Sequence, residues 1–121
     1  MPCFILVTQE QEIETYMTKS MLTIEEINDY MVFDGVPANS QIVEELSFSD
    51  PSIVMLCDAD AGFKELEANC LTKTGEVICG EVLILTNSKS DESDADNLGL
   101  LTLRQAQIVK EELRFYQDAS L

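Results

Sequence analysis

The stretch Glu76-Val77-Ile78-Cys79-Gly80-Glu81-Val82-Leu83-Ile84-Leu85-Thr86 is the longest run of β-favouring residues in the chain. Its branched apolar side chains are typical of a strand that packs on a core. An isolated glycine inside such a run indicates a bulge or a bend, so Gly80 is the expected irregularity. We therefore expect one long strand over residues 76–86, and the rest of the fold to be arranged around it.

Four further stretches predict strands or turns on the N-terminal side of this run. Ile53 to Cys57 is apolar throughout, as in a central strand, and the turn signal Ser49-Asp50-Pro51-Ser52 precedes it. Gln41 to Phe48 can form another strand. Residues 4–8 and 12–18 alternate or cluster apolar side chains around a short polar interruption, which predicts a hairpin. The residues between Gly62 and Thr74 are polar and indicate a connection.

Two helices are expected, each opened by a capping box. Thr23 and Glu26 form the first box, and Ile24, Ile27 and Met31 follow on one face at helical spacing. Thr102 and Gln105 form the second box. A stripe that would face a core then continues to the end of the chain, formed by Leu103, Ala106, Val109, Leu113 and Tyr116.

These elements predict one α+β domain over residues 1–121, with a mostly antiparallel sheet and two amphipathic helices, the second at the C-terminus. A chain of 121 residues is large enough for one hydrophobic core. Residues 87–99 are rich in serine and aspartate and contain little to bury, so we expect a mobile acidic loop there.

The charge of the chain limits its partners. Its 23 acidic and 7 basic residues give a net charge of −16, and residues 1–60 contribute −11 of it, from twelve acids and one lysine. Direct binding of nucleic acid or of an anionic membrane surface is not expected, because both require clustered lysine and arginine. A signal peptide and a membrane span are not visible in the sequence, which favours a cytoplasmic protein.

The residue types needed for most catalytic sites are missing. The sequence has no histidine, and it contains neither a G-x-x-x-x-G-K-[ST] nor a G-x-G-x-x-G motif for phosphate. Four cysteines, without a C-x-x-C pair, are expected to be reduced and mostly buried. We therefore predict a protein that is not an enzyme and needs no cofactor.

Asp58 and Asp60 are the best-placed carboxylate pair. They follow the predicted central strand, and residues two apart on a strand lie on the same face about 6.6 Å apart. Such a pair can bind a divalent metal or a small ligand at the end of a strand. The alternative is that Asp58-Ala59-Asp60-Ala61-Gly62 is a solvated turn.

The order of the elements resembles that of a family of short proteins of unknown function found on phages, plasmids and other mobile elements. The resembling segments are residues 54–58 leading into Gly62-Phe63-Lys64, residues 75–84, and the acidic loop before residues 101–107. The resemblance implies a small α+β fold and a mobile-element setting, and it carries over no catalytic residue. The longer acidic insert at residues 88–96 departs from the family pattern.

The main hypothesis is a binding protein whose negative surface engages a basic site on a host protein, as an inhibitor or a mimic of nucleic acid. Opposite charges speed and orient such association. The candidate contact residues lie on predicted strand and helix faces: Glu10, Glu12, Glu14, Glu25, Glu26, Asp29, Glu44 and Glu45. One alternative is ligand or metal binding at Asp58 and Asp60. The other is that the charge serves only solubility.

Overall fold

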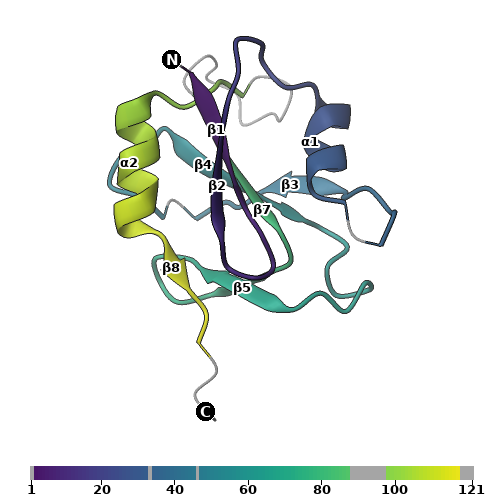
Figure 1. Ribbon diagram of the computed structural model, residues 1–121. Helices are drawn as coiled ribbons and strands as arrows, with labels where there is room; N and C mark the ends of the chain where they lie inside the picture. The colour runs from purple at the N-terminus through teal and green to yellow at the C-terminus, as the bar shows by residue number, and fades with distance from the viewer. Residues whose placement is uncertain (1, 33, 46, 88–97, 118–121) are drawn as a thin grey trace.

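The computed structural model describes residues 2–32, 34–45, 47–87 and 98–117. This part of the chain forms two helices and eight strands in two antiparallel sheets (Figure 1). The fold class expected from the sequence, a mostly antiparallel α+β protein, is confirmed. In the described residues, no helix is long and apolar enough to cross a membrane.

The larger sheet has five strands in the order β2-β1-β7-β4-β3. Its central strand β7 pairs with β1 on one side and β4 on the other, with Val82 opposite Val7 and Thr86 opposite Ile53. Strands β2 and β3 form the two edges. The bounds are β1 Cys3–Val7, β2 Ile13–Met17, β3 Ser40–Ile42, β4 Ile53–Asp58 and β7 Val82–Thr86.

The predicted N-terminal hairpin is confirmed as β1 and β2, paired from Cys3 opposite Met17 to Val7 opposite Ile13. At its tip Gln11 takes a positive φ of 63°. The Gln11 side-chain amide donates to the carbonyl oxygens of Asn69 and Tyr116, at 3.1 and 2.7 Å. The hairpin tip is therefore tied to the second sheet.

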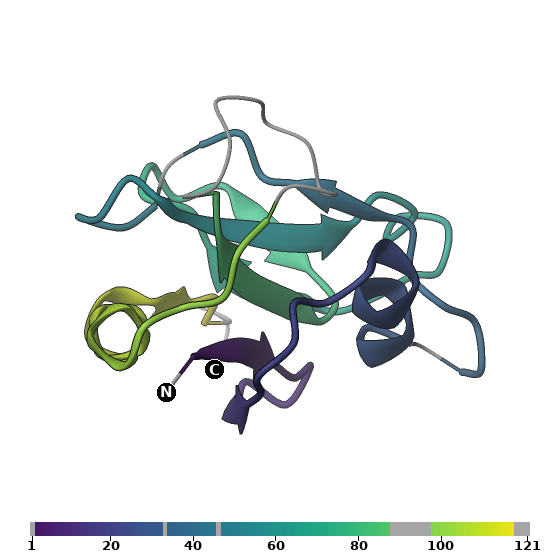
Figure 2. The same cartoon turned by 90° about the horizontal axis from the view of Figure 1, so that it is seen from above.

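The two faces of the large sheet are covered by different helices (Figure 2). On one face the side chains of Cys3, Ile5 and Val7 pack with Ala106 and Val109 of α2 (Leu103–Glu112). On the other face Phe4, Leu6 and Leu83 pack with Ile27 and Met31 of α1 (Ile24–Tyr30). Each fully buried side chain of this size contributes roughly 1.5–3 kcal/mol, so both faces stabilise the sheet.

Both predicted capping boxes are present. The Thr23 hydroxyl accepts from the Glu26 amide at 3.1 Å, and the Glu26 carboxylate accepts from the Thr23 amide at 3.0 Å. Thr102 and Gln105 make the same pair of bonds at 3.1 and 2.9 Å. Since an uncapped helix leaves its first amides unsatisfied, the boxes set where α1 and α2 begin.

The smaller sheet has the order β6-β5-β8 and packs on the α2 side of the large sheet. Its strands are β5 Ala68–Leu71, β6 Val77–Cys79 and β8 Arg114–Phe115. The prediction that residues 68–71 belong to a polar connection is wrong, because they form β5 and Asn69 and Cys70 are fully buried there. The expected helix through Tyr116 ends at Glu112, since Leu113 is extended and β8 pairs with β5.

The expectation of one strand over residues 76–86 is also wrong, because the run serves both sheets. Its first part is β6 in the small sheet, and its second part is β7 in the large one. Gly80 lies between them with φ of +83°, a left-handed conformation that glycine adopts without steric cost. Its amide donates to Glu67 O at 2.8 Å and its carbonyl accepts from the Asn69 side chain at 2.8 Å.

Two loops differ from expectation as well. The strand predicted for Gln41 to Phe48 is shorter, since β3 ends at Ile42. Most of the predicted acidic loop, residues 88–97, lies outside the described residues. At its end Leu98 and Gly99 are buried, and Gly99 exchanges two backbone hydrogen bonds with Thr86, so these two residues belong to the packed fold.

Replacing Gly80 with alanine is expected to destabilise the protein by about 2–4 kcal/mol. A Cβ at this position would lie 2.6 Å from Leu66 Cδ1, and the left-handed φ adds about 1–2 kcal/mol of strain. Urea unfolding followed by circular dichroism measures the change. Gly75→Ala separates the two effects, because Gly75 has φ of +94° but open space around it.

Gly62→Ala is the second control for this experiment, since its Cβ meets nothing and its φ is not left-handed. We expect a change within about 0.5 kcal/mol there. An equal loss for all three variants would show that Gly80 has no special place in the fold.

Candidate functional site: an acidic groove between two strand edges

An open groove with a volume of about 1440 Å³ separates the β3–β4 edge of the large sheet from β6 of the small sheet. Two runs of consecutive residues line it, 41–45 and 76–79. Successive side chains of a strand point to opposite faces, so a cleft over one face would be lined by alternate residues. Lining by consecutive residues places the groove along the edges of β3 and β6.

The turn after β4, residues 59–66, contributes Ala61, Gly62, Glu65 and Leu66 to the lining. It is held by the carboxylate of Asp58, the last residue of β4. One oxygen accepts from the backbone amides of Asn39 and Asp60, at 3.1 and 2.9 Å, and the other pairs with Lys64 Nζ at 2.6 Å.

The lining is acidic. It includes Glu44, Glu45, Glu65 and Glu76, and among the described residues the lining contains neither lysine nor arginine. The Asp58 carboxylate also borders the groove, but Lys64 balances its charge. Beside these carboxylates the groove offers apolar contact surface from Val43, Leu66, Val77 and Ile78. The site therefore matches a ligand that carries positive charge together with apolar groups.

Glu45 is positioned by the neighbouring loop. Its carboxylate accepts from the Thr74 amide at 3.2 Å. Hydrogen bonds from the side chains of Thr72 and Thr74 hold the pKa of Glu45 below its ordinary value. Glu45 consequently stays ionised at neutral pH, while Glu44, Glu65 and Glu76 are exposed at the groove.

Two of the four cysteines lie in the groove, which corrects the expectation that most are buried. Cys57 and Cys79 are half-buried lining residues, and Cys3 and Cys70 are fully buried. All four are free thiols. Burial raises the pKa of the Cys57 thiol, and the Asp58 carboxylate raises it further. Cys57 is therefore a poor nucleophile at neutral pH, where the reactive form is the thiolate.

Asp58 and Asp60 do not form the carboxylate pair considered from the sequence. Asp58 is buried and fully engaged by Lys64 and by two amides, whereas Asp60 takes part through its backbone. In the described residues, His, Cys, Asp and Glu side chains form no group of three that could hold a metal ion. Asp58 is therefore a buried carboxylate that holds the turn together, and it fits neither a solvated turn nor a carboxylate open to a ligand.

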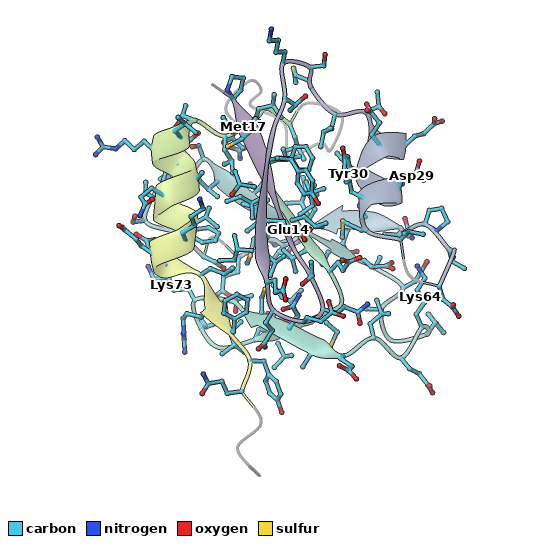
Figure 3. The ribbon with its side chains drawn as sticks, in the orientation of Figure 1. Glu14, Met17, Asp29, Tyr30, Lys64 and Lys73 are labelled. Carbon is cyan, nitrogen blue, oxygen red and sulfur yellow. The ribbon has the colours of Figure 1, made fainter. Side chains whose placement is uncertain are left out.

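The eight predicted contact residues separate into three places. Glu10, Glu12 and Glu14 belong to the β1–β2 hairpin at the β2 edge of the large sheet. Glu44 and Glu45 follow β3 at the opposite edge, so the two sets do not meet. Figure 3 shows Glu14 on β2 at the front of the molecule and Asp29 on the outer side of α1. Glu25, Glu26 and Asp29 are exposed on that helix.

A further carboxylate, Glu81, lies near the hairpin acids, and no sequence pattern related it to them. Burial raises the pKa of Glu81, at the start of β7, and the charges of Glu10 and Glu14 raise it further. The Tyr16 hydroxyl donates to Glu14 at 2.8 Å, and the Tyr16 ring packs with Phe4 and Tyr30. These carboxylates thus lie beside an aromatic cluster that joins β1, β2 and α1.

The sequence analysis also missed Glu65 and Glu76, which share the groove with Glu44 and Glu45. Glu65 lies in the turn after β4, and Glu76 directly precedes β6. Glu65 and Glu76 are 21 and 32 residues from Glu44 in the sequence, so strand and helix periodicity could not relate them. In the sequence, these two glutamates were indicated only by their positions close to the ends of predicted strands.

Comparisons of the chain with protein-family models, with curated proteins and with solved structures find no match. The resemblance to short proteins of mobile elements therefore stays a prediction.

Replacing Asp58 with asparagine is expected to cost about 1.5–3 kcal/mol of stability at pH 7, since Lys64 loses its charged partner and the hydrogen bonds to the carboxylate lose a charged acceptor. Burial raises the pKa of Asp58, but Lys64 and the amides of Asp60 and Asn39 outweigh it, so the pKa is lowered overall. The stabilisation is therefore present above pH ~4 and lost as the pH falls through the lowered pKa. Urea unfolding across this pH range should show the difference between the two proteins shrinking.

Asp60→Asn is the matched control, because the Asp60 carboxylate makes no hydrogen bond to another described residue. We expect a change within about 0.5 kcal/mol at every pH. A larger loss for Asp60→Asn than for Asp58→Asn would reverse the assignment of the turn.

Proposed function

We propose that this protein is a non-enzymatic binding protein that holds a basic segment of a partner protein in the groove between β3 and β6. The observation that carries the proposal is the lining itself, with Glu44, Glu65 and Glu76 exposed at the groove and apolar side chains among the other lining residues. Ionised carboxylates around an apolar surface favour a ligand that brings lysine or arginine with apolar groups.

The size of the groove supports a polypeptide over a small molecule. Sites for small molecules are usually about 300–1000 Å³ and enclose most of the ligand. A volume of about 1440 Å³ in an open groove exceeds that range.

The distribution of basic side chains supports the same site. Arg104 and Lys110 lie on α2, and Arg114 on β8 donates to Lys73 O at 3.2 Å. Arg104, Lys110 and Arg114 are therefore gathered around α2 and the small sheet's far edge, whereas Lys64 pairs with Asp58 and Lys73 acts on Glu45 at the groove. An approaching cationic segment is steered toward the uncompensated carboxylates.

A mimic of nucleic acid is favoured less by the structure. Duplex DNA carries one charge per about 1.7 Å along its axis. The acids proposed for such mimicry lie on the β2 edge, on α1 and after β3, so they are spread around the molecule. The idea that the partner is a host protein, inhibited by a product of a mobile element, rests on the family resemblance alone.

A triple variant, Glu44→Gln, Glu65→Gln and Glu76→Gln, is expected to bind a basic peptide about tenfold more weakly at low salt. Each exposed ion pair contributes about 0.5 kcal/mol, and three together amount to roughly a tenfold change in Kd. The probe is a fluorescent peptide of about eight residues with alternating lysine and valine, and fluorescence anisotropy gives Kd.

The matched control is Glu12→Gln, Glu25→Gln and Asp29→Asn, which changes the net charge by the same amount at exposed positions away from the groove. We expect less than about a threefold change. Equal weakening in both variants would mean that the peptide responds to the overall charge and not to the groove. Absence of binding to the unmodified protein would leave the charge with a solubilising role.

Alkylation of the cysteines gives a second measurement that is independent of charge variants. Cys57 and Cys79 line the groove, whereas Cys3 and Cys70 are inaccessible. Burial raises the pKa of Cys70 to about 12, which further slows its reaction. Bound peptide should slow iodoacetamide labelling of Cys57 and Cys79, followed by mass spectrometry. Unchanged labelling at saturating peptide would place the peptide elsewhere.

A further inference from the structure

We infer that the groove takes its ligand as an extended strand that adds to the free edge of β6, so that backbone hydrogen bonds supply part of the affinity. This inference rests on the proposed function, and it adds the conformation of the ligand and the element that receives it. The occupant is an extended segment of another protein in which basic and apolar side chains alternate.

Among the described residues, the hydrogen-bond pattern of the small sheet leaves the β6 edge open. The Thr72 amide donates to Glu76 O at 2.9 Å, and Cys70 lies opposite Ile78. Hydrogen-bonded and non-bonded pairs alternate in an antiparallel ladder, so Leu71 and Val77 form a non-bonded pair. The amide and carbonyl of Val77 therefore point away from β5, along the edge that borders the groove.

The strand on the opposite wall of the groove, β3, does not pair with the free edge of β6. β3 belongs to the large sheet and pairs only with β4 among the described residues. The outward amide of Ser40 is already satisfied by the side chain of Asn28 on α1, at 3.1 Å. The partly capped β3 edge can then contact side chains of a segment that hydrogen-bonds to β6.

The residues that line the groove can contact an added strand in which basic and apolar side chains alternate. Successive residues of an added strand point in opposite directions, so one set can pack on apolar lining while the other reaches carboxylates. Val77 is 42% exposed on the edge strand itself, and Glu76 directly precedes it. The groove supplies apolar and acidic contacts side by side, as such an alternating segment requires.

A second copy of this chain is the less suitable occupant. Open strand edges invite self-association, and native proteins counter it with charged side chains at the edge. Glu76 and Glu44 at the groove would face the same carboxylates in a second copy, and each chain carries a net charge of −16. Charge complementarity thus selects a cationic chain over the protein itself.

The test compares the alternating lysine–valine peptide with the same peptide N-methylated at every second residue. Methylation removes the amide donors of one edge and leaves the charges and side chains in place. We expect at least a tenfold loss of affinity when the methyl groups lie on the edge that faces β6, and less than about a threefold loss when they lie on the other edge. Equal affinity of all three peptides would overturn strand addition.

A variant of the protein tests whether the edge of β6 receives the added strand. Proline is tolerated at an edge position whose amide points outward, so Val77→Pro should fold yet lose the donor for the added strand. We expect about a tenfold weaker binding, with Val77→Thr, which keeps the amide, close to the unmodified protein. If Val77→Pro does not fold, hydrogen exchange of the unmodified protein replaces it. The Val77 amide should then exchange more slowly when peptide is bound.

The outcomes separate this inference from the proposed function. Salt-sensitive binding that depends on Glu44, Glu65 and Glu76 but ignores N-methylation and leaves Val77 exchange unchanged would keep the groove and reject strand addition. Loss of peptide binding in every form would reject both. A dimer by size-exclusion chromatography that dissociates on Val77→Pro would make a second copy the occupant and overturn the basic segment.

Discussion

The side chain of Asn69 joins the parts of this fold that are distant in sequence. It is fully buried on β5, and its amide nitrogen donates to Gly80 O at 2.8 Å and to Val7 O at 3.4 Å. Its backbone carbonyl accepts from the Gln11 side chain and from the Tyr116 amide. One residue thus fixes the bend at Gly80, the end of β1, the hairpin tip and the segment after β8. The side-chain oxygen of Asn69 has no hydrogen-bond partner among the described residues, but the bonds of its amide nitrogen and backbone carbonyl link the two sheets.

The groove follows from that arrangement. The chain leaves the small sheet at Gly80 and enters the large sheet as β7, so β6 is displaced from the plane in which β7 continues. α2 and the small sheet cover much of one face of the large sheet, but they leave the β3–β4 edge open. A free edge of β6 then borders this gap. The same bend that completes the core therefore creates the candidate site.

The charges are arranged so that the acids have different roles. Asp50 and Glu112 act within the fold: Asp50 accepts from Ser52 and Gln105, Glu112 accepts from Ser49, and hydrogen bonds lower the pKa of both carboxyls. The pKa of Glu81 is shifted in the opposite direction, because burial and then the charges of the nearby hairpin acids raise it. The groove glutamates outside these networks remain available to a ligand. The carboxylates that can bind a ligand are therefore different residues from those that stabilise the fold.

The sequence by itself determined the local elements. The capping boxes at Thr23 and Thr102, the hairpin of residues 4–17 and the apolar strand from Ile53 depend on neighbours within a few residues, so periodicity and capping chemistry predict them. Only the tertiary structure decided the rest. β5 has too little apolar pattern to be recognised alone, and β8 forms because its pairing with β5 outweighs the helical preference after Glu112. The groove needs Glu44, Glu65 and Glu76 from three separate segments, and their proximity results from long-range packing that no local pattern encodes.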